Sequence, residues 1–125
     1  LNAAPEVQGI GVTTKNIKSQ TLPDNTSTAT TINEFPALAG KGIFIKYKIV
    51  RGTLDRTGEF TISASTTAVG FDDTFTESGA DIGVTLTAAL DDKDSTAGNE
   101  TVAFKFTTTS TGTAATIDYQ TTILA

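Results

Sequence analysis

Acidic side chains gather in the second half of the chain, where their chemistry could serve catalysis. Seven acids lie between positions 72 and 94, namely Asp72, Asp73, Glu77, Asp81, Asp91, Asp92 and Asp94. Two carboxyl groups that face each other across a sugar, about 5 to 10 Å apart, can hydrolyse a glycosidic bond. The spacing of these acids fixes no such geometry, and acids in turns usually form solvated loops that protect sheet edges. We therefore expect these carboxylates to lie in turns and none of them to be catalytic.

Calcium binding is a second possible use of the same acids. Asp92, Asp94 and Thr96 alternate in the way that the first ligands of a calcium loop do. The sixth position of such a loop should be glycine and the twelfth a bidentate glutamate, but this chain has Ala97 and Ala103 there. The sequence therefore predicts no metal site.

The residue types that the chain lacks exclude most of the common reaction mechanisms. Its 125 residues include no His, no Cys, no Met and no Trp. Without His and Cys there is no thiol nucleophile, no Ser-His-Asp triad, no disulfide, and no ligation of zinc, haem or iron–sulfur clusters through those residues. No glycine-rich loop leads from a strand into a helix, so nucleotide binding is not expected either. The sequence predicts a protein that is not an enzyme and holds no cofactor.

The overall charge narrows the range of partners. Fourteen acids against nine bases give a net charge of −5 and an isoelectric point near 4.5. We do not expect a protein this acidic to bind nucleic acid or anionic membranes. No apolar run reaches the roughly 18 to 20 residues of a membrane span, and the first residues lack the pattern of a signal peptide. We expect a soluble protein whose partners are proteins or sugars.

Basic residues gather upstream of the acidic segment. Between positions 41 and 56 there are five bases and one acid. In an extended strand, two of these lysines and two apolar residues would share one face. We call this face the basic strip and define it by Phe44, Lys46, Lys48 and Val50. Lysines on a strand often do no more than protect a sheet edge. Because two apolar side chains share this face, the strip fits a contact between copies of the chain better, and we predict that it is an interface.

The two tyrosines could serve as platforms on which sugar rings stack. Tyr47 lies between Ile45 and Ile49 in an alternating run. Tyr119 follows Ile117 at the same spacing. Both rings are therefore in phase with the apolar faces of their strands, and we expect both to pack in the core.

The elements that must position these residues are strands. Apolar residues recur with period 2, and Thr, of which there are 26, fills many of the alternating positions together with Val, Ile and Phe. Strands are expected at 43–51, 60–64, 84–88, 102–106 and 115–123, with weaker candidates at 28–35 and 10–17. The polar segment 52–58 is expected to be the loop of a hairpin, and 22–25 a turn. Strands 102–106 and 115–123 are expected to pair antiparallel around a Thr-rich tip.

Short strands with no helical pattern between them predict an all-β fold, an antiparallel β-sandwich of the jelly-roll or immunoglobulin-like kind. One domain, residues 20–125, should hold the core, while residues 1–19 form an N-terminal arm or a first strand. Nine residues are expected in that core, namely Ile45, Tyr47, Ile49, Phe60, Ile62, Leu86, Phe104, Phe106 and Ile117.

Short motifs follow one another in a recognisable order along residues 20–125. They are Tyr47-Lys-Ile-Val-Arg-Gly52, Arg56-Thr-Gly58, the strand 59–64, Phe75-Thr-Glu-Ser-Gly79, Gly83-Val-Thr-Leu86 and a Thr-rich hairpin. This order resembles small Thr-rich β-sandwich modules in the virion structural proteins of tailed bacteriophages, found in tail fibres, head fibres and capsid decoration proteins.

The resemblance implies a non-enzymatic building block, commonly trimeric, exposed on the surface of a virus particle. Its partners would be further copies of the chain and other virion proteins, such as major capsid or tail proteins. These modules share a scaffold and no site motif, so no binding residue is carried over. The alternative function is a carbohydrate-binding or adhesin module that recognises surface glycans, including those of a host.

Overall fold

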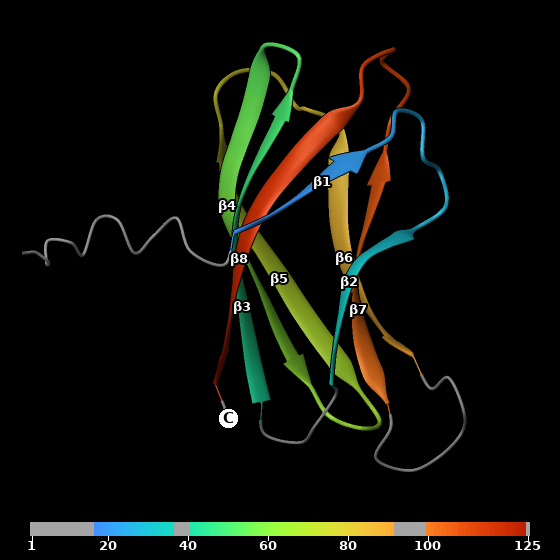
Figure 1. The fold of residues 1–125 in the computed structure, drawn as a ribbon, viewed down its shortest axis with the longest axis vertical. Helices are drawn as coiled ribbons and strands as arrows, with labels where there is room; N and C mark the ends of the chain where they lie inside the picture. Colours follow the sequence, from blue (N-terminus) through green and yellow to red (C-terminus); the bar gives the residue numbers. More distant parts are fainter. Residues whose placement is uncertain (1–16, 37–40, 92–99, 125) are drawn as a thin grey trace, which may run out of the picture.

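The structure, a computed structural model, describes residues 17–36, 41–91 and 100–124. These residues form eight strands and no helix that could cross a membrane. The strands are β1 (Lys18–Leu22), β2 (Thr30–Pro36), β3 (Lys41–Arg51), β4 (Leu54–Ala64), β5 (Val69–Glu77), β6 (Val84–Asp91), β7 (Thr101–Thr108) and β8 (Ala115–Leu124) (Figure 1).

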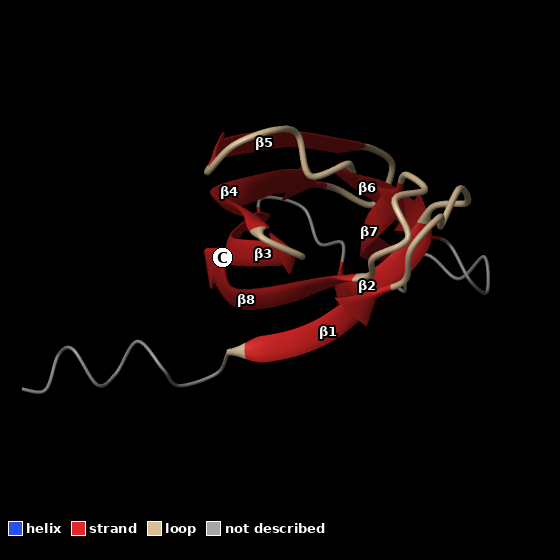
Figure 2. Cartoon of the chain, turned by 90° about the horizontal axis from the view of Figure 1, so that it is seen from above, coloured by secondary structure: helices blue, strands red, loops and turns tan. Residues whose placement is uncertain are grey.

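Two antiparallel sheets pack face to face and confirm the predicted β-sandwich. One sheet has five strands in the order β1-β8-β3-β4-β5, and the other has three in the order β2-β7-β6. Figure 2 shows the two sheets side by side, with β5 and β6 at one rim of the sandwich and β1 and β2 at the other.

The core lies between the sheets and contains all nine residues that the alternation predicts. Aromatic rings connect the two layers at its centre. The ring of Phe104 on β7 lies 5.0 Å from that of Phe60 on β4 and 6.0 Å from that of Tyr119 on β8, measured between centroids. Both tyrosine rings are buried, as expected. These contacts fix one sheet against the other, because interlocked aromatic rings bury large apolar areas.

The hairpin of β3 and β4 is tighter than the sequence suggests. The segment 52–58, expected to be a polar loop, contains only a two-residue connection, because Arg51 already pairs with Leu54. Gly52 adopts the left-handed conformation (φ 63°) that a two-residue hairpin turn needs. The strand therefore begins at Leu54, and the arginine at position 56 lies in the sheet.

The expected pairing of strands 102–106 and 115–123 is wrong. In the structure β7 pairs with β2 and β6, whereas β8 pairs with β1 and β3 in the other sheet. The physical reason is that β7 is a central strand whose two edges are both hydrogen-bonded, so no edge is left for β8. The polar connection between them crosses from one sheet to the other.

Two strands have no counterpart in the expected set. β5 carries three acids that were expected in turns, Asp72, Asp73 and Glu77. β1 begins at Lys18 and pairs with β8, across the expected boundary between arm and sandwich. The turn expected at 22–25 is present, since Asn25 adopts a left-handed backbone conformation (φ 56°) there. The weak strand candidate at 10–17 and the calcium-like segment 92–96 fall almost entirely outside the described residues.

Candidate functional site

The basic strip lies on the outer face of the five-stranded sheet, along β3. Its four residues alternate with Ile43, Ile45, Tyr47 and Ile49, which point into the core. Lys46 and Lys48 are exposed, Val50 is 42% exposed, and Phe44 is partly buried. The parity of the strand thus gives the strip the arrangement that the sequence predicts.

The lysines of the strip have acidic neighbours on the same face. Glu59 of β4 lies opposite Lys46, and Asp118 of β8 lies opposite Lys48. None of the ion pairs formed among the described residues includes either lysine. Asp118 instead accepts a hydrogen bond from the hydroxyl of Ser19. Within the described part of the chain, neither ammonium group is held by an ion pair.

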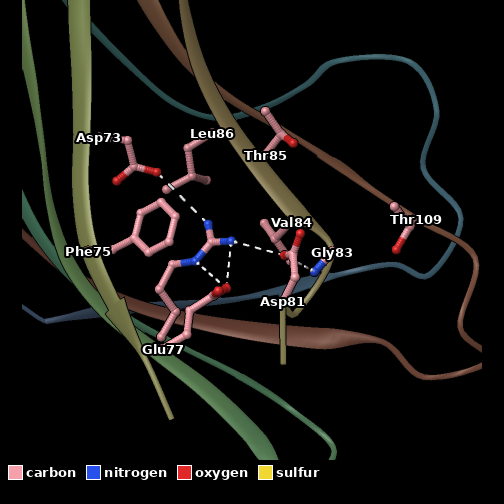
Figure 3. Close-up of a pocket in the computed structure, with 10 residues that line it drawn as sticks. Asp73, Phe75, Glu77, Asp81, Gly83, Val84, Thr85, Leu86 and Thr109 are labelled. Carbon is pink, nitrogen blue, oxygen red and sulfur yellow. Dashed lines mark hydrogen bonds and ion pairs between the residues drawn. The ribbon is translucent and has the colours of Figure 1, made fainter. Parts of the chain in front are cut away.

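A groove opens between β5 and β6, the edge strands of the two sheets, and has a volume of about 430 Å³ (Figure 3). We call it the edge groove and define it by Arg56, Asp73, Phe75, Glu77, Asp81 and Thr85. Three of these residues lie on the inward face of β5, which at the rim of the sandwich is only partly covered. Three carboxylates and one guanidinium give the groove a formal charge of −2.

The buried side chain of Arg56 contacts several residues of the edge groove. Its side chain is almost fully buried, and its Nε and Nη2 donate to Oε2 of Glu77 at 3.1 and 3.0 Å. Its guanidinium carbon lies 4.0 Å from the ring centroid of Phe75, a cation–π contact. Oδ2 of Asp73 lies 3.9 Å from Nη1 of Arg56, and Oδ1 of Asp81 lies 3.7 Å from Nη2 of the same side chain. A buried guanidinium needs such compensation, so these contacts hold the edge strand in place.

The phenol of Tyr47 reaches the groove from the core. Its hydroxyl donates to Oδ1 of Asp73 at 2.6 Å. Burial, followed by this hydrogen bond, raises the pKa of Tyr47 above its ordinary value. Burial also raises the pKa of Asp73, and the nearby Asp72 adds to that effect, while Tyr47 and Arg56 oppose it. Asp73 is thus a carboxyl group held by structural partners in a partly desolvated position.

The raised pKa of Asp73 predicts a specific pH dependence of stability. Because protonation is easier in the folded state, the contribution of Asp73 is full below its ordinary pKa of 3.8 and is lost as pH rises through the folded value. We predict that Asp73→Asn, which keeps an acceptor for the Tyr47 hydroxyl, removes this contribution. In urea unfolding between pH 7 and pH 4, the wild type should gain stability relative to the variant as pH falls. A constant difference across that range would contradict the prediction.

Gly58 makes the approach of Tyr47 to β5 possible. A Cβ atom at this position would lie 2.6 Å from the carbonyl oxygen of Thr74, 2.7 Å from Cβ of Phe75 and 2.8 Å from the hydroxyl of Tyr47. Two of these contacts involve atoms that cannot rotate away. We predict that Gly58→Ala lowers the free energy of unfolding by about 1 to 3 kcal/mol, the usual range for overpacking.

Gly70 on the neighbouring strand is the matched control for this variant. A Cβ atom there would meet nothing within 4 Å, and its φ is not positive. Gly70→Ala should be neutral or slightly stabilising, because alanine restricts the unfolded chain. Thermal and urea melts of both variants measure the difference, and equal effects of the two substitutions would refute a steric role for Gly58.

A second buried arginine lies at the end of β3. Arg51 donates through Nε to the carbonyl of Thr113 (2.8 Å) and through Nη1 to those of Ile82 (2.9 Å) and Gly83 (3.2 Å). Its Nη2 donates to the carbonyl of Thr109 (2.7 Å) and to Oδ1 of Asp24 (2.6 Å). One side chain therefore ties three loops together at one end of the sandwich.

Asp24 completes this tie from the turn that follows β1. Backbone N–H groups of Thr111 and Gly112 donate to its carboxylate at 2.8 and 3.0 Å. The hydrogen bond from Thr111 is the largest cause that lowers the pKa of Asp24, and Arg51 adds to it. The cluster is a structural clamp, since its polar groups are directed at one another.

The structure brings together only some of the acids in the segment 72–94. Asp73, Glu77 and Asp81 meet around Arg56. Asp72 lies on the opposite, exposed face of β5, and Asp91 ends β6. Asp92 and Asp94 lie outside the described residues.

Sequence reasoning missed both buried arginines, although a signal for them exists. Arg51 continues the inward parity of the isoleucines of β3, and Arg56 shares the parity of Phe60 and Ile62 on β4. A basic residue in phase with a core face needs internal partners, because an unpaired charge is costly to bury. Parity was thus the available signal, and the supposed 52–58 loop obscured it.

The carboxylates of the edge groove already accept hydrogen bonds from neighbouring groups of the chain. Glu77 already accepts from Arg56 and from the backbone N–H of Ile82 (3.2 Å). Asp73 accepts from Tyr47. Within the described ranges no group of three or more acidic side chains is arranged to hold a metal ion. Groups engaged in this way fix the shape and charge of the groove.

Neither protein-family models nor curated proteins nor solved structures give a match to this chain. The likeness to bacteriophage virion modules therefore stays an expectation that the residue motifs carry. What the basic strip and the edge groove do is inferred from their contacts, burial and charge.

Proposed function

We propose that the chain is a non-enzymatic structural module of a bacteriophage particle, a surface-exposed decoration or fibre module. In this role it forms a homotrimer and binds other virion proteins, such as major capsid or tail proteins. The observation that carries the proposal is the basic strip, an apolar and basic row on an uncovered sheet face whose lysines have no ion-pair partner among the described residues.

The energetics of such a contact follow from the residue types of the strip. Apolar contact through Phe44 and Val50 supplies most of the affinity, since it removes apolar area from water. Pairs of the lysines with carboxylates chiefly set register and encounter rate, because rim ion pairs contribute only about 0 to 1 kcal/mol each and are screened by salt. The lysines thus act on specificity more than on strength.

A substitution in the strip tests self-association. We predict that Phe44→Asp breaks assembly and leaves the fold intact, because Phe44 lies on the outer face of β3. Lys46→Ala should weaken assembly slightly and reduce its salt dependence. Light scattering measures the molar mass, and circular dichroism checks the fold. A wild type that is monomeric at high micromolar concentration, or a Phe44→Asp variant that assembles normally, would overturn the role of the strip.

The location on a particle needs its own test. Quantitative mass spectrometry of purified particles from a phage that encodes the chain should find it in a copy number divisible by three. Antibodies against the folded domain should label intact particles, since the module is exposed. Absence of the chain from purified particles would reject the virion role.

Carbohydrate binding is a second candidate function, favoured by the aromatic rings of β5. Phe71 and Phe75 lie on the same side of the strand and are 46% and 44% exposed, and Phe75 adjoins the carboxylates of the edge groove. Exposed rings beside polar groups can stack on sugars. In a glycan array the wild type would then bind a defined glycan, and Phe75→Ala would lose that signal. An array without a reproducible signal would exclude this candidate.

A further inference from the structure

The proposed trimer requires a second contact surface on each copy of the chain, in addition to the basic strip. Successive copies around a three-fold axis meet through different patches, because only a two-fold axis places a patch against itself. A copy that presents the basic strip must therefore find a complementary surface on its neighbour. That surface should offer apolar area and negative charge.

The edge groove and the ring beside it meet both requirements. Phe71 and Phe75, the two phenylalanines of β5, are each almost half exposed, although Phe71 stacks on Phe60 at 5.4 Å and Phe75 packs on the guanidinium of Arg56. Each ring thus has one supported side and one uncovered side. Large apolar side chains left exposed together on one strand are typical of contact surfaces.

The charges of the two surfaces also match. The groove has a formal charge of −2, from Asp73, Glu77 and Asp81 against Arg56, and the strip has two lysines, beside which Glu59 and Asp118 lie on the same face. The side chain of Asp81 is 81% exposed and can approach a partner without rearrangement. Of the carboxylates in the groove it is the one that a lysine from outside meets most easily.

We propose that the edge groove, together with Phe71, is the acceptor surface for the basic strip of a second copy of this chain. The inference rests on the proposed function, since it names the partner surface within that oligomer. Phe44 and Val50 of one copy cover the exposed rings of β5 in the next, while Lys46 and Lys48 enter the acidic groove. Their long side chains suit this role, because the aliphatic stem packs on apolar surface and the ammonium extends beyond it. The contact is head-to-tail and closes after three copies.

Charge reversal tests the pairing of the two surfaces. We expect Lys46→Glu with Lys48→Glu to weaken association about tenfold or more, and Asp81→Lys to do the same, because like charges then face each other. All three substitutions in one chain should restore assembly toward the wild-type level. Asp91→Lys is the matched control, since it changes the net charge equally at the far end of β6 and should not rescue the double lysine variant. Sedimentation equilibrium gives the association constants.

Asp81→Lys places a positive charge near Arg56 and could disturb the fold, so a second variant tests the same surface without changing its charge. Phe71→Ser removes an exposed ring and should also reduce association, with circular dichroism confirming the fold. If Asp81→Lys and Phe71→Ser assemble like the wild type while Phe44→Asp is monomeric, the acceptor surface is wrong and the role of the strip survives. If rescue by Asp91→Lys equals that by Asp81→Lys, the effect is one of net charge and the pairing is rejected. A monomeric wild type would overturn both proposals.

Discussion

Phe104→Ala is expected to lower the free energy of unfolding by about 3 to 5 kcal/mol, the range for removing a buried phenylalanine ring. The ring of Phe104 is fully buried at the centre of the core. It contacts Phe60 and Tyr119, which both belong to the opposite sheet. Its removal would leave a cavity that neighbouring strands cannot fill, because both edges of β7 are fixed by hydrogen bonds.

An exposed apolar residue provides the control for this variant. Ile123 on β8 is 42% exposed, so Ile123→Ala should cost much less than the core substitution. Urea unfolding of the wild type, Phe104→Ala and Ile123→Ala, fitted with a common slope, gives the free energies to be compared. A loss below about 1 kcal/mol for Phe104→Ala would show that this ring contributes little, contrary to the usual cost of an aromatic cavity.

Alternation along single strands was the reliable part of the sequence information. A period of 2 predicts which side chains of a half-buried strand face inward, and the inward residues of β3, β6 and β7 follow it. The arrangement of Phe44 and Val50 on the outer face of β3 follows from the same rule. This kind of information is local, because each side chain is placed by its own strand.

The alternation of residues along single strands does not predict which strands pair with each other. The connection from β7 to β8 has the Thr, Ser and Gly residues of a hairpin tip, yet it crosses between sheets. What decides the matter is that β7 pairs with β2 along one edge and with β6 along the other, which makes it the central strand of its sheet. Partners of that kind depend on contacts between distant segments, which a single sequence does not display.

The edge groove was hidden for a related reason. β5 has no clean apolar alternation, since its inward side carries Asp73 and Glu77 between and beside the two phenylalanines. Such a strand resembles a polar turn in sequence. It is stable as a strand because the buried Arg56 on β4 compensates the inward acids, and that compensation is visible only when the two strands are paired.

Arg51→Met is expected to be the most damaging change outside the apolar core. The substitution removes the donors for the carbonyls of Thr109, Thr113, Ile82 and Gly83 and leaves Asp24 without its cationic partner. Leaving a buried acceptor without its donor, as at the carbonyl of Ile82, costs about 1 to 3 kcal/mol, and Arg51→Met does this while it also removes the donors of three further carbonyls. Arg51→Lys should be intermediate, because an ammonium keeps the charge but lacks the planar fork that reaches several carbonyls at once.

Local hydrogen exchange in the three loops distinguishes a structural clamp from ordinary packing. Lys18→Met, an exposed change on β1 outside both proposed contact surfaces, is the control and should alter stability by no more than about 0.5 kcal/mol. Hydrogen exchange should show that Arg51→Met speeds exchange at the backbone N–H groups of Thr109, Thr111 and Gly112, because they bond to Gly83 or Asp24 within the clamp. If Arg51→Met costs no more than Lys18→Met, or if exchange at these loop amides is unchanged, the three loops do not depend on Arg51. The predicted outcome would show that Arg51, although arginine is usually a solvated surface residue, holds three loops together at one end of the sandwich.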